Sequence, residues 1–167
     1  MKRNKNGRVR DQQRSRVYSW ERLVVGKEDI GDMSLPSCQL LVCRCFGWWY
    51  RIGKPEKNAR QFLVSSIIPD VVRGRENSLD AARGSSRTIS LPLWARSKIV
   101  VLHETAHAIV DNHGLTAKDG GHGPYFMRVY IELLGHYMKF DRAYLTRSAK
   151  KDGIKVHPMY KIDRPKP

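Results

Sequence analysis

A short run of residues, His103-Glu104-Thr105-Ala106-His107, has the types and spacing of a metal-dependent hydrolytic site. Two histidines four positions apart project from one face of a helix, so both imidazoles can bind one metal ion. A glutamate directly after the first histidine would lie beside that ion, where its carboxylate can take a proton from a water molecule. The spacing predicts a zinc hydrolase site with His103 and His107 as ligands and Glu104 as the catalytic base.

A catalytic zinc ion takes three protein ligands and leaves one position for water, so a third ligand is needed. His113 has the spacing of the pattern His-Glu-x-x-His-x-x-Gly-x-x-His, but Val110 stands where that pattern needs a glycine to turn the chain. We therefore expect His113 near the C-terminus of the helix. Glu132 is a second candidate, but it should point about 130° away from the apolar stripe of its own helix and be solvated.

The third candidate, His122, lies fifteen residues after His107 within Gly121-His122-Gly123-Pro124. The flanking glycines allow the backbone to approach the first helix closely, which favours His122 as the third ligand over a loop histidine or a helix cap. Asp111, four residues after His107, is a candidate to accept the other ring N–H of a histidine ligand, the alternative being a helix-ending residue.

Periodicity, prolines and capping residues indicate the elements that must position these side chains. A small antiparallel sheet is expected from apolar runs separated by turn residues, at 62–64, 67–68, 71–72 and 88–91. A first element is expected at about 13–25. Helices are expected from Ser34 to Tyr50, from Trp94 to about Asn112 with Pro92 before it and Gly114 after it, and from Pro124 onward. The fold class is therefore α+β, with the sheet beside an active-site helix and further helices.

The chain has 167 residues and a strong positive charge, with 31 Lys+Arg against 16 Asp+Glu. We expect a flexible basic arm at residues 1–10, a single domain at 11–150 and a basic C-terminal tail at 151–167. A net charge of +15 favours anionic partners, so DNA could bind through the basic termini. A merely solvated basic surface is the alternative.

No apolar run approaches the roughly 18 residues that span a bilayer, and the N-terminus lacks a signal-peptide core. We expect a cytoplasmic protein with no membrane partner. Cys38, Cys43 and Cys45 do not form an even disulfide framework and fall in an apolar helical segment. They are expected to be small, mostly buried side chains.

The run His103 to His107, followed by His122-Gly123-Pro124-Tyr125-Phe126, resembles the SprT-like zinc metallopeptidases, whose best-known member is the Spartan protease of DNA–protein crosslink repair. Residues 10–18 and 89–107 are also similar to a small family of metallohydrolases of actinobacteria and their phages. The resemblance implies a zincin-like fold, zinc on His103, His107 and His122, and Glu104 as catalytic base. Longer SprT members carry a C-terminal zinc ribbon that the cysteines of this chain cannot form.

The expected function is hydrolysis of peptide bonds by a zinc-dependent metallopeptidase, with DNA-associated proteins among the substrates. An edge strand at Thr88 to Leu91 is expected to hold the substrate by pairing with it. Two alternatives stay open. One is a DNA-associated binding protein with a structural or silent metal site, and the other is a regulatory metalloprotease that cleaves a repressor.

Overall fold

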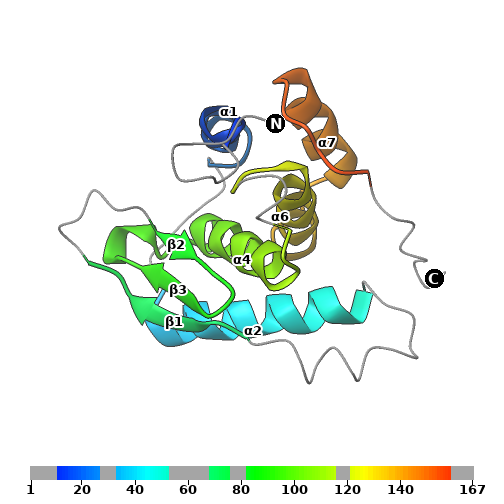
Figure 1. Ribbon diagram of the computed structural model, residues 1–167. Helices are drawn as coiled ribbons and strands as arrows, with labels where there is room; N and C mark the ends of the chain where they lie inside the picture. Colours follow the sequence, from blue (N-terminus) through cyan, green and yellow to red (C-terminus); the bar gives the residue numbers. More distant parts are fainter. Residues whose placement is uncertain (1–10, 27–32, 53–67, 76–81, 116–120, 159–167) are drawn as a thin grey trace, which may run out of the picture.

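The computed structural model describes residues 11–26, 33–52, 68–75, 82–115 and 121–158. The expected basic arm and the apolar run at 62–64 lie outside the described residues. The described part is an α+β fold, as predicted (Figure 1). The helices are α1 (Arg14–Trp20), η1 (Glu21–Val25), α2 (Leu35–Ile52), η3 (Leu93–Ala95), α4 (Lys98–Asn112), α6 (Pro124–Tyr137) and α7 (Arg142–Lys151), and the strands are β1 (Asp70–Arg73), β2 (Arg83–Gly84) and β3 (Thr88–Leu91).

Helix α4 lies at the centre of the fold, between helices α2 and α6 and beside the sheet (Figure 1). Its apolar residues Leu102, Ala106 and Ile109 are fully buried because neighbours cover the helix on several sides. The predicted start at Trp94 was wrong. Leu93–Ala95 form a separate 3-10 turn, and α4 begins after Ser97, whose hydroxyl accepts a hydrogen bond from the backbone N–H of Val100.

The three described strands form a mixed sheet in the order β1-β3-β2. β1 runs parallel to β3, and β2 runs antiparallel to it. The prediction of an antiparallel sheet was therefore wrong for β1 and β3, because apolar patterning identifies strands without fixing their direction. β3 has a neighbour on each side, so Thr88–Leu91 is not the edge strand that we expected. Ile89 and Leu91 are buried, whereas Thr88 and Ser90 on the opposite face are half-buried.

Strand β2 lies unusually close to α4, and a glycine makes this approach possible. A Cβ atom added at Gly84 would clash with the carbonyl oxygen of Glu104 and lie 2.9 Å from its carbonyl carbon. These are backbone atoms that cannot rotate away, so only glycine fits at this position. The contact places β2 directly beside the residue predicted to be the catalytic base.

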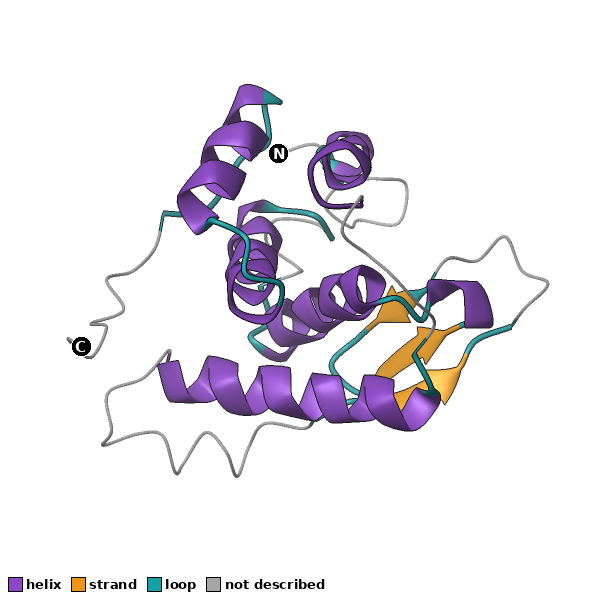
Figure 2. Ribbon diagram, turned by 180° about the vertical axis from the view of Figure 1, so that it is seen from behind, coloured by secondary structure: helices purple, strands orange, loops and turns teal. Residues whose placement is uncertain are grey.

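The N-terminal helix lies on the opposite side of α4 from α2, near α7 (Figures 1 and 2). Trp20 is fully buried, and its indole N–H donates to the hydroxyl of Ser148 on α7 at 2.9 Å. The chain after α7 also packs on the body of the protein, since Ile154 is buried and the backbone N–H of His157 donates to Pro124. In the described part of the chain, no helix is both long and apolar enough to span a membrane.

Candidate metal centre

Three histidines from two parts of the chain meet beside α4. His103 and His107 lie one turn apart on that helix, and His122 comes from the loop that leads into α6. One ring nitrogen of each residue lies within 4.8 Å of the corresponding atoms of the other two. His103 and His122 are 2% and 5% exposed, so the cluster is largely shielded from solvent. The three residues named as candidate ligands in the sequence therefore lie together, in an arrangement that could hold a metal ion.

The separation of two ring nitrogens fits the dimensions of a bound metal ion. The Nε2 atoms of His103 and His122 are 3.2 Å apart. Two imidazole nitrogens bound to a tetrahedral zinc ion at about 2.0–2.1 Å would be roughly 3.3 Å apart. The two side chains therefore already have the spacing that a shared zinc ion requires.

A carboxylate from η1 holds the far side of the His103 ring. Oε2 of Glu21 lies 2.7 Å from Nδ1 of His103, and the Glu21 side chain is only 14% exposed. Burial alone would raise the pKa of Glu21 and lower that of His103. Attraction between the two groups outweighs burial, so the pKa of Glu21 is lowered and the pKa of His103 is raised. Glu21 begins a turn of π-helix, an irregularity that often occurs at functional sites.

A second carboxylate holds His122 in the same manner. Oδ2 of Asp11 lies 2.6 Å from Nδ1 of His122 and also accepts the backbone N–H of that residue at 3.2 Å. Burial opposes the charge on Asp11, but these hydrogen bonds outweigh it and lower the pKa of the carboxyl group. The side-chain amide of Gln13 donates to the His122 carbonyl at 2.8 Å. The N-terminal segment thus fixes both the ring and the backbone of His122.

These two carboxylates decide which ring nitrogens face each other. A carboxylate only accepts hydrogen bonds, so the Nδ1 atoms of His103 and His122 carry protons. Neutral rings then turn unprotonated Nε2 atoms toward each other at 3.2 Å, which brings two lone pairs together. Either one Nε2 atom keeps a proton and donates it to the other, or a metal ion binds both. A proton can be shared by two nitrogens, whereas a metal ion can also engage His107.

The third histidine lies against an aromatic wall. The ring of Phe126 on α6 stacks on His107 with a centroid separation of 4.3 Å, and its centroid lies 4.9 Å from those of both His103 and His122. Burial, reinforced by repulsion from the other two histidines, holds the pKa of His107 well below its ordinary value. His107 is therefore held neutral, which is the state in which imidazole binds a metal.

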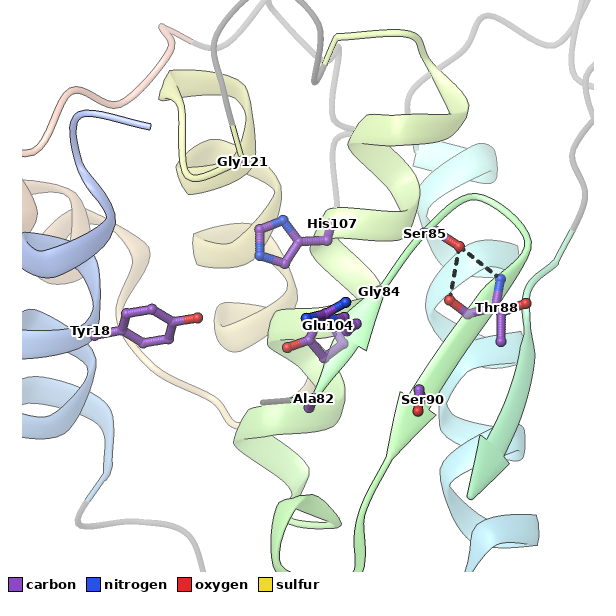
Figure 3. Close-up of a pocket in the computed structure, with 10 residues that line it drawn as sticks. Tyr18, Ala82, Gly84, Ser85, Thr88, Ser90, Glu104, His107 and Gly121 are labelled. Carbon is purple, nitrogen blue, oxygen red and sulfur yellow. Dashed lines mark hydrogen bonds between the residues drawn. The ribbon is translucent and has the colours of Figure 1, made fainter. Parts of the chain in front are cut away.

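Glu104 and His107 open into a cleft of about 500 Å³. Tyr18 on α1 forms one side of the cleft, and residues of β2, β3 and the turn between them form the other (Figure 3). Glu104 is 5% exposed, and its burial raises the pKa of the carboxyl group. Electrostatic attraction to His103 and a hydrogen bond from the backbone N–H of Gly84 oppose this rise in pKa. A carboxylate with a raised pKa beside a cleft is suited to accept a proton and return it.

The structure places the remaining sequence candidates elsewhere. His113 caps the C-terminus of α4, as expected, and its ring packs 5.8 Å from that of Tyr50. Glu132 is buried rather than solvated, because α7 covers it and Nε of Arg142 lies 2.7 Å from its carboxylate. Asp111 accepts a hydrogen bond from the backbone N–H of Ser86 at 2.9 Å, so its carboxylate holds the turn between β2 and β3.

Sequence reasoning missed the three residues that the N-terminal segment brings to the site: Asp11, Tyr18 and Glu21. The Tyr18 ring stacks on His103 with a centroid separation of 5.5 Å and an interplanar angle of 7°. A signal did exist, since these polar residues follow one another at intervals of seven and three positions, which suit one face of a helix. Nothing in that spacing pointed to a partner more than eighty residues away.

Comparison with known proteins found no match for this chain among family models, curated proteins or solved structures. The chain contains a buried cluster of three histidines, within the described residues, that could hold a metal ion.

Proposed function

We propose that this protein is a zinc-dependent metallopeptidase that hydrolyses peptide bonds in the cleft beside α4. One observation carries the proposal. Two imidazoles whose Nδ1 atoms face carboxylates turn their Nε2 atoms toward each other at 3.2 Å, with a third histidine beside them. Three imidazole ligands suit zinc and leave a fourth position for water.

The proposed hydrolysis depends on the residues beside the histidines on the side that faces the cleft. Zinc at such a site would lower the pKa of a water molecule toward about 7 and polarise the scissile carbonyl group. Glu104 takes the proton from the water as its oxygen attacks the carbonyl carbon, and later gives that proton to the leaving amine. Of the three candidate ligands, His107 is the one that lines the cleft with Glu104, which supports a substrate approaching from this side.

The proposal is tested by measuring zinc content and proteolysis on the same preparations. We expect wild-type protein to bind one zinc ion per chain and to cleave a general substrate such as fluorescently labelled casein. Glu104→Gln should keep the zinc and lose turnover, because the amide cannot accept the proton. His122→Ala should lose zinc, whereas His113→Ala, which removes a histidine at the far end of α4, should retain it. Absence of zinc from the wild type would refute the proposal.

An exposed basic surface favours DNA-associated proteins as the substrates. Arg147, Lys150 and Lys151 on α7 are exposed, as is Lys155 after it, and Arg16 of α1 donates to the carbonyl of Gly153 beside them at 2.7 Å. Clustered cations of this kind bind phosphates and release counterions, so that affinity falls steeply with salt. We propose that this surface, named the α7 basic surface, recruits the enzyme to DNA.

A charge-matched pair of variants tests the DNA proposal. The double variant Arg147→Glu/Lys151→Glu should bind a labelled oligonucleotide more weakly and with a shallower salt dependence. Arg75→Glu/Arg87→Glu changes the net charge equally at exposed positions near the sheet and should bind almost as the wild type does. Equal losses in both variants would show that net charge, not the α7 basic surface, governs binding. Cleavage of a short peptide should remain unchanged in both.

A further inference from the structure

We propose that the hydroxyl group of Tyr18 donates the hydrogen bond that stabilises the oxyanion formed when a peptide carbonyl is attacked in this cleft. The inference rests on the proposed peptidase function and adds a catalytic residue from the N-terminal helix. Peptide hydrolysis passes through a tetrahedral species whose oxygen carries a full negative charge, and a fixed donor beside that oxygen lowers the barrier.

Tyr18 is placed where such a donor must be. It lines the cleft together with Glu104 and His107, the proposed base and one proposed ligand. Figure 3 shows the side chain reaching across from α1, with its hydroxyl oxygen directed toward these two residues. A carbonyl group attacked by a water molecule beside Glu104 would therefore lie within the space that the hydroxyl faces.

The ring of Tyr18 is held by the histidine cluster itself. It stacks on His103 and meets His122 edge-on, with a centroid separation of 5.0 Å and an interplanar angle of 61°. The guanidinium carbon of Arg14 lies 5.7 Å from the ring centroid. A donor whose ring is packed in this way needs little reorganisation during the reaction, which is what makes such hydrogen bonds effective.

The reaction balances with Tyr18 acting only as a donor. The water oxygen forms a bond to the carbonyl carbon, the π electron pair moves onto the carbonyl oxygen, and the proton of the water passes to Glu104. The Tyr18 O–H donates to the new oxyanion and keeps its proton. When the C–N bond breaks, the electron pair returns to form the carbonyl, and the proton on Glu104 passes to the leaving amine.

The variant Tyr18→Phe isolates the hydroxyl because it keeps the ring that packs on the histidines. With the zinc-loaded protein and labelled casein, we expect kcat to fall roughly 100-fold with little change in KM. Zinc affinity and thermal stability should match the wild type. Affinity for a phosphinic peptide, whose tetrahedral oxygens mimic the oxyanion, should fall by a comparable factor. Tyr125→Phe is the matched control, because it removes the same hydroxyl group from a tyrosine whose ring stacks on His157, with a centroid separation of 4.0 Å.

The outcomes separate the two proposals. Wild-type turnover in Tyr18→Phe, or unchanged binding of the phosphinic peptide, would overturn the role of Tyr18 and leave the peptidase proposal standing. Loss of zinc or of stability in Tyr18→Phe would show that the hydroxyl supports the structure of the site instead, and would also overturn the inference. A zinc-loaded wild-type protein that cleaves nothing would overturn the proposed function itself.

Discussion

Removing the carboxylates behind the histidines should weaken zinc binding without touching a ligand. Glu21→Gln and Asp11→Asn each replace a charged acceptor with a neutral one of nearly the same shape. The hydrogen bonds at stake are 2.7 Å and 2.6 Å long, in the range of charge-assisted bonds. A bond of this kind contributes about 1.5–3 kcal/mol.

The expected loss of affinity follows from these values. Since about 1.4 kcal/mol corresponds to a factor of ten, full loss of either bond would weaken zinc binding roughly 10- to 100-fold. An amide oxygen retains part of the bond, so we expect about tenfold for each variant. The larger loss should come from Glu21→Gln, because the Glu21 side chain is 14% exposed and that of Asp11 is 24% exposed.

The loss should also depend on pH. Burial alone would lower the pKa of His103, but Glu21 raises it, so in the zinc-free protein a proton competes with zinc for this ring. Without the carboxylate the pKa of His103 falls and that competition weakens. The difference between wild type and Glu21→Gln should therefore be largest in mildly alkaline buffer and shrink as the buffer becomes acidic.

Competition against a chromophoric chelator measures the zinc dissociation constants directly. Asp111→Asn is the matched control, because this carboxylate accepts from the backbone N–H of Ser86. It should bind zinc as the wild type does. Equal dissociation constants for Glu21→Gln, Asp11→Asn and the wild type would refute the view that these carboxylates orient the ligands. A loss in Asp111→Asn as large as in Glu21→Gln would show that the effect is not specific to the hydrogen-bonded carboxylates.

Three further predictions concern the packing around the site. Gly84→Ala should lower the free energy of unfolding by about 1–3 kcal/mol in urea titrations, because the added Cβ would clash with the backbone of Glu104. An unchanged midpoint of the urea titration would contradict the close approach of β2 to α4. Iodoacetamide should modify the partly exposed Cys43 in the folded protein and spare Cys45, because burial raises the pKa of the Cys45 thiol to about 12. Equal labelling of the two cysteines, measured by mass spectrometry, would contradict this prediction. Asp141→Ala should cost about 1 kcal/mol in thermal unfolding, because the Asp141 carboxylate accepts the backbone N–H of Ala143, the second residue of α7, at 2.8 Å. An unchanged melting temperature would mean that this cap is not formed in solution.

The histidine cluster could be predicted because the sequence patterns that indicate it lie within about twenty residues of one another. His103 and His107 are related by helical periodicity, and the glycines around His122 allow a close approach that requires no distant partner. The carboxylates behind them could not be predicted in this way. Glu21 lies 82 residues from His103 in sequence, and Asp11 lies 111 residues from His122. Only the docking of the N-terminal helix brings these groups together.

The errors in the fold have similar causes. Helical periodicity predicted that Glu132 points away from the apolar stripe of its helix and is solvated. The expected solvation was wrong, because α7 packs there and supplies Arg142. Alternating apolar residues identified β3, yet strand direction depends on how the chain returns to the sheet, and β1 proved parallel to it. Pro92 suited a helix start, but a 3-10 turn ended first and Ser97 capped α4.

The N-terminal segment has a thermodynamic consequence for the whole protein. Residues Asp11 and Glu21 contact the histidines only while α1 and η1 are docked, so docking would favour the binding of a metal ion at this cluster and the ion would favour docking. By linkage, the factor by which docking tightens metal binding equals the factor by which metal stabilises docking. Metal supply would then set how firmly the first helix is held, and any partner that pulls α1 away would release the ion. Docking of the N-terminal segment would thus control the metal occupancy of the proposed site.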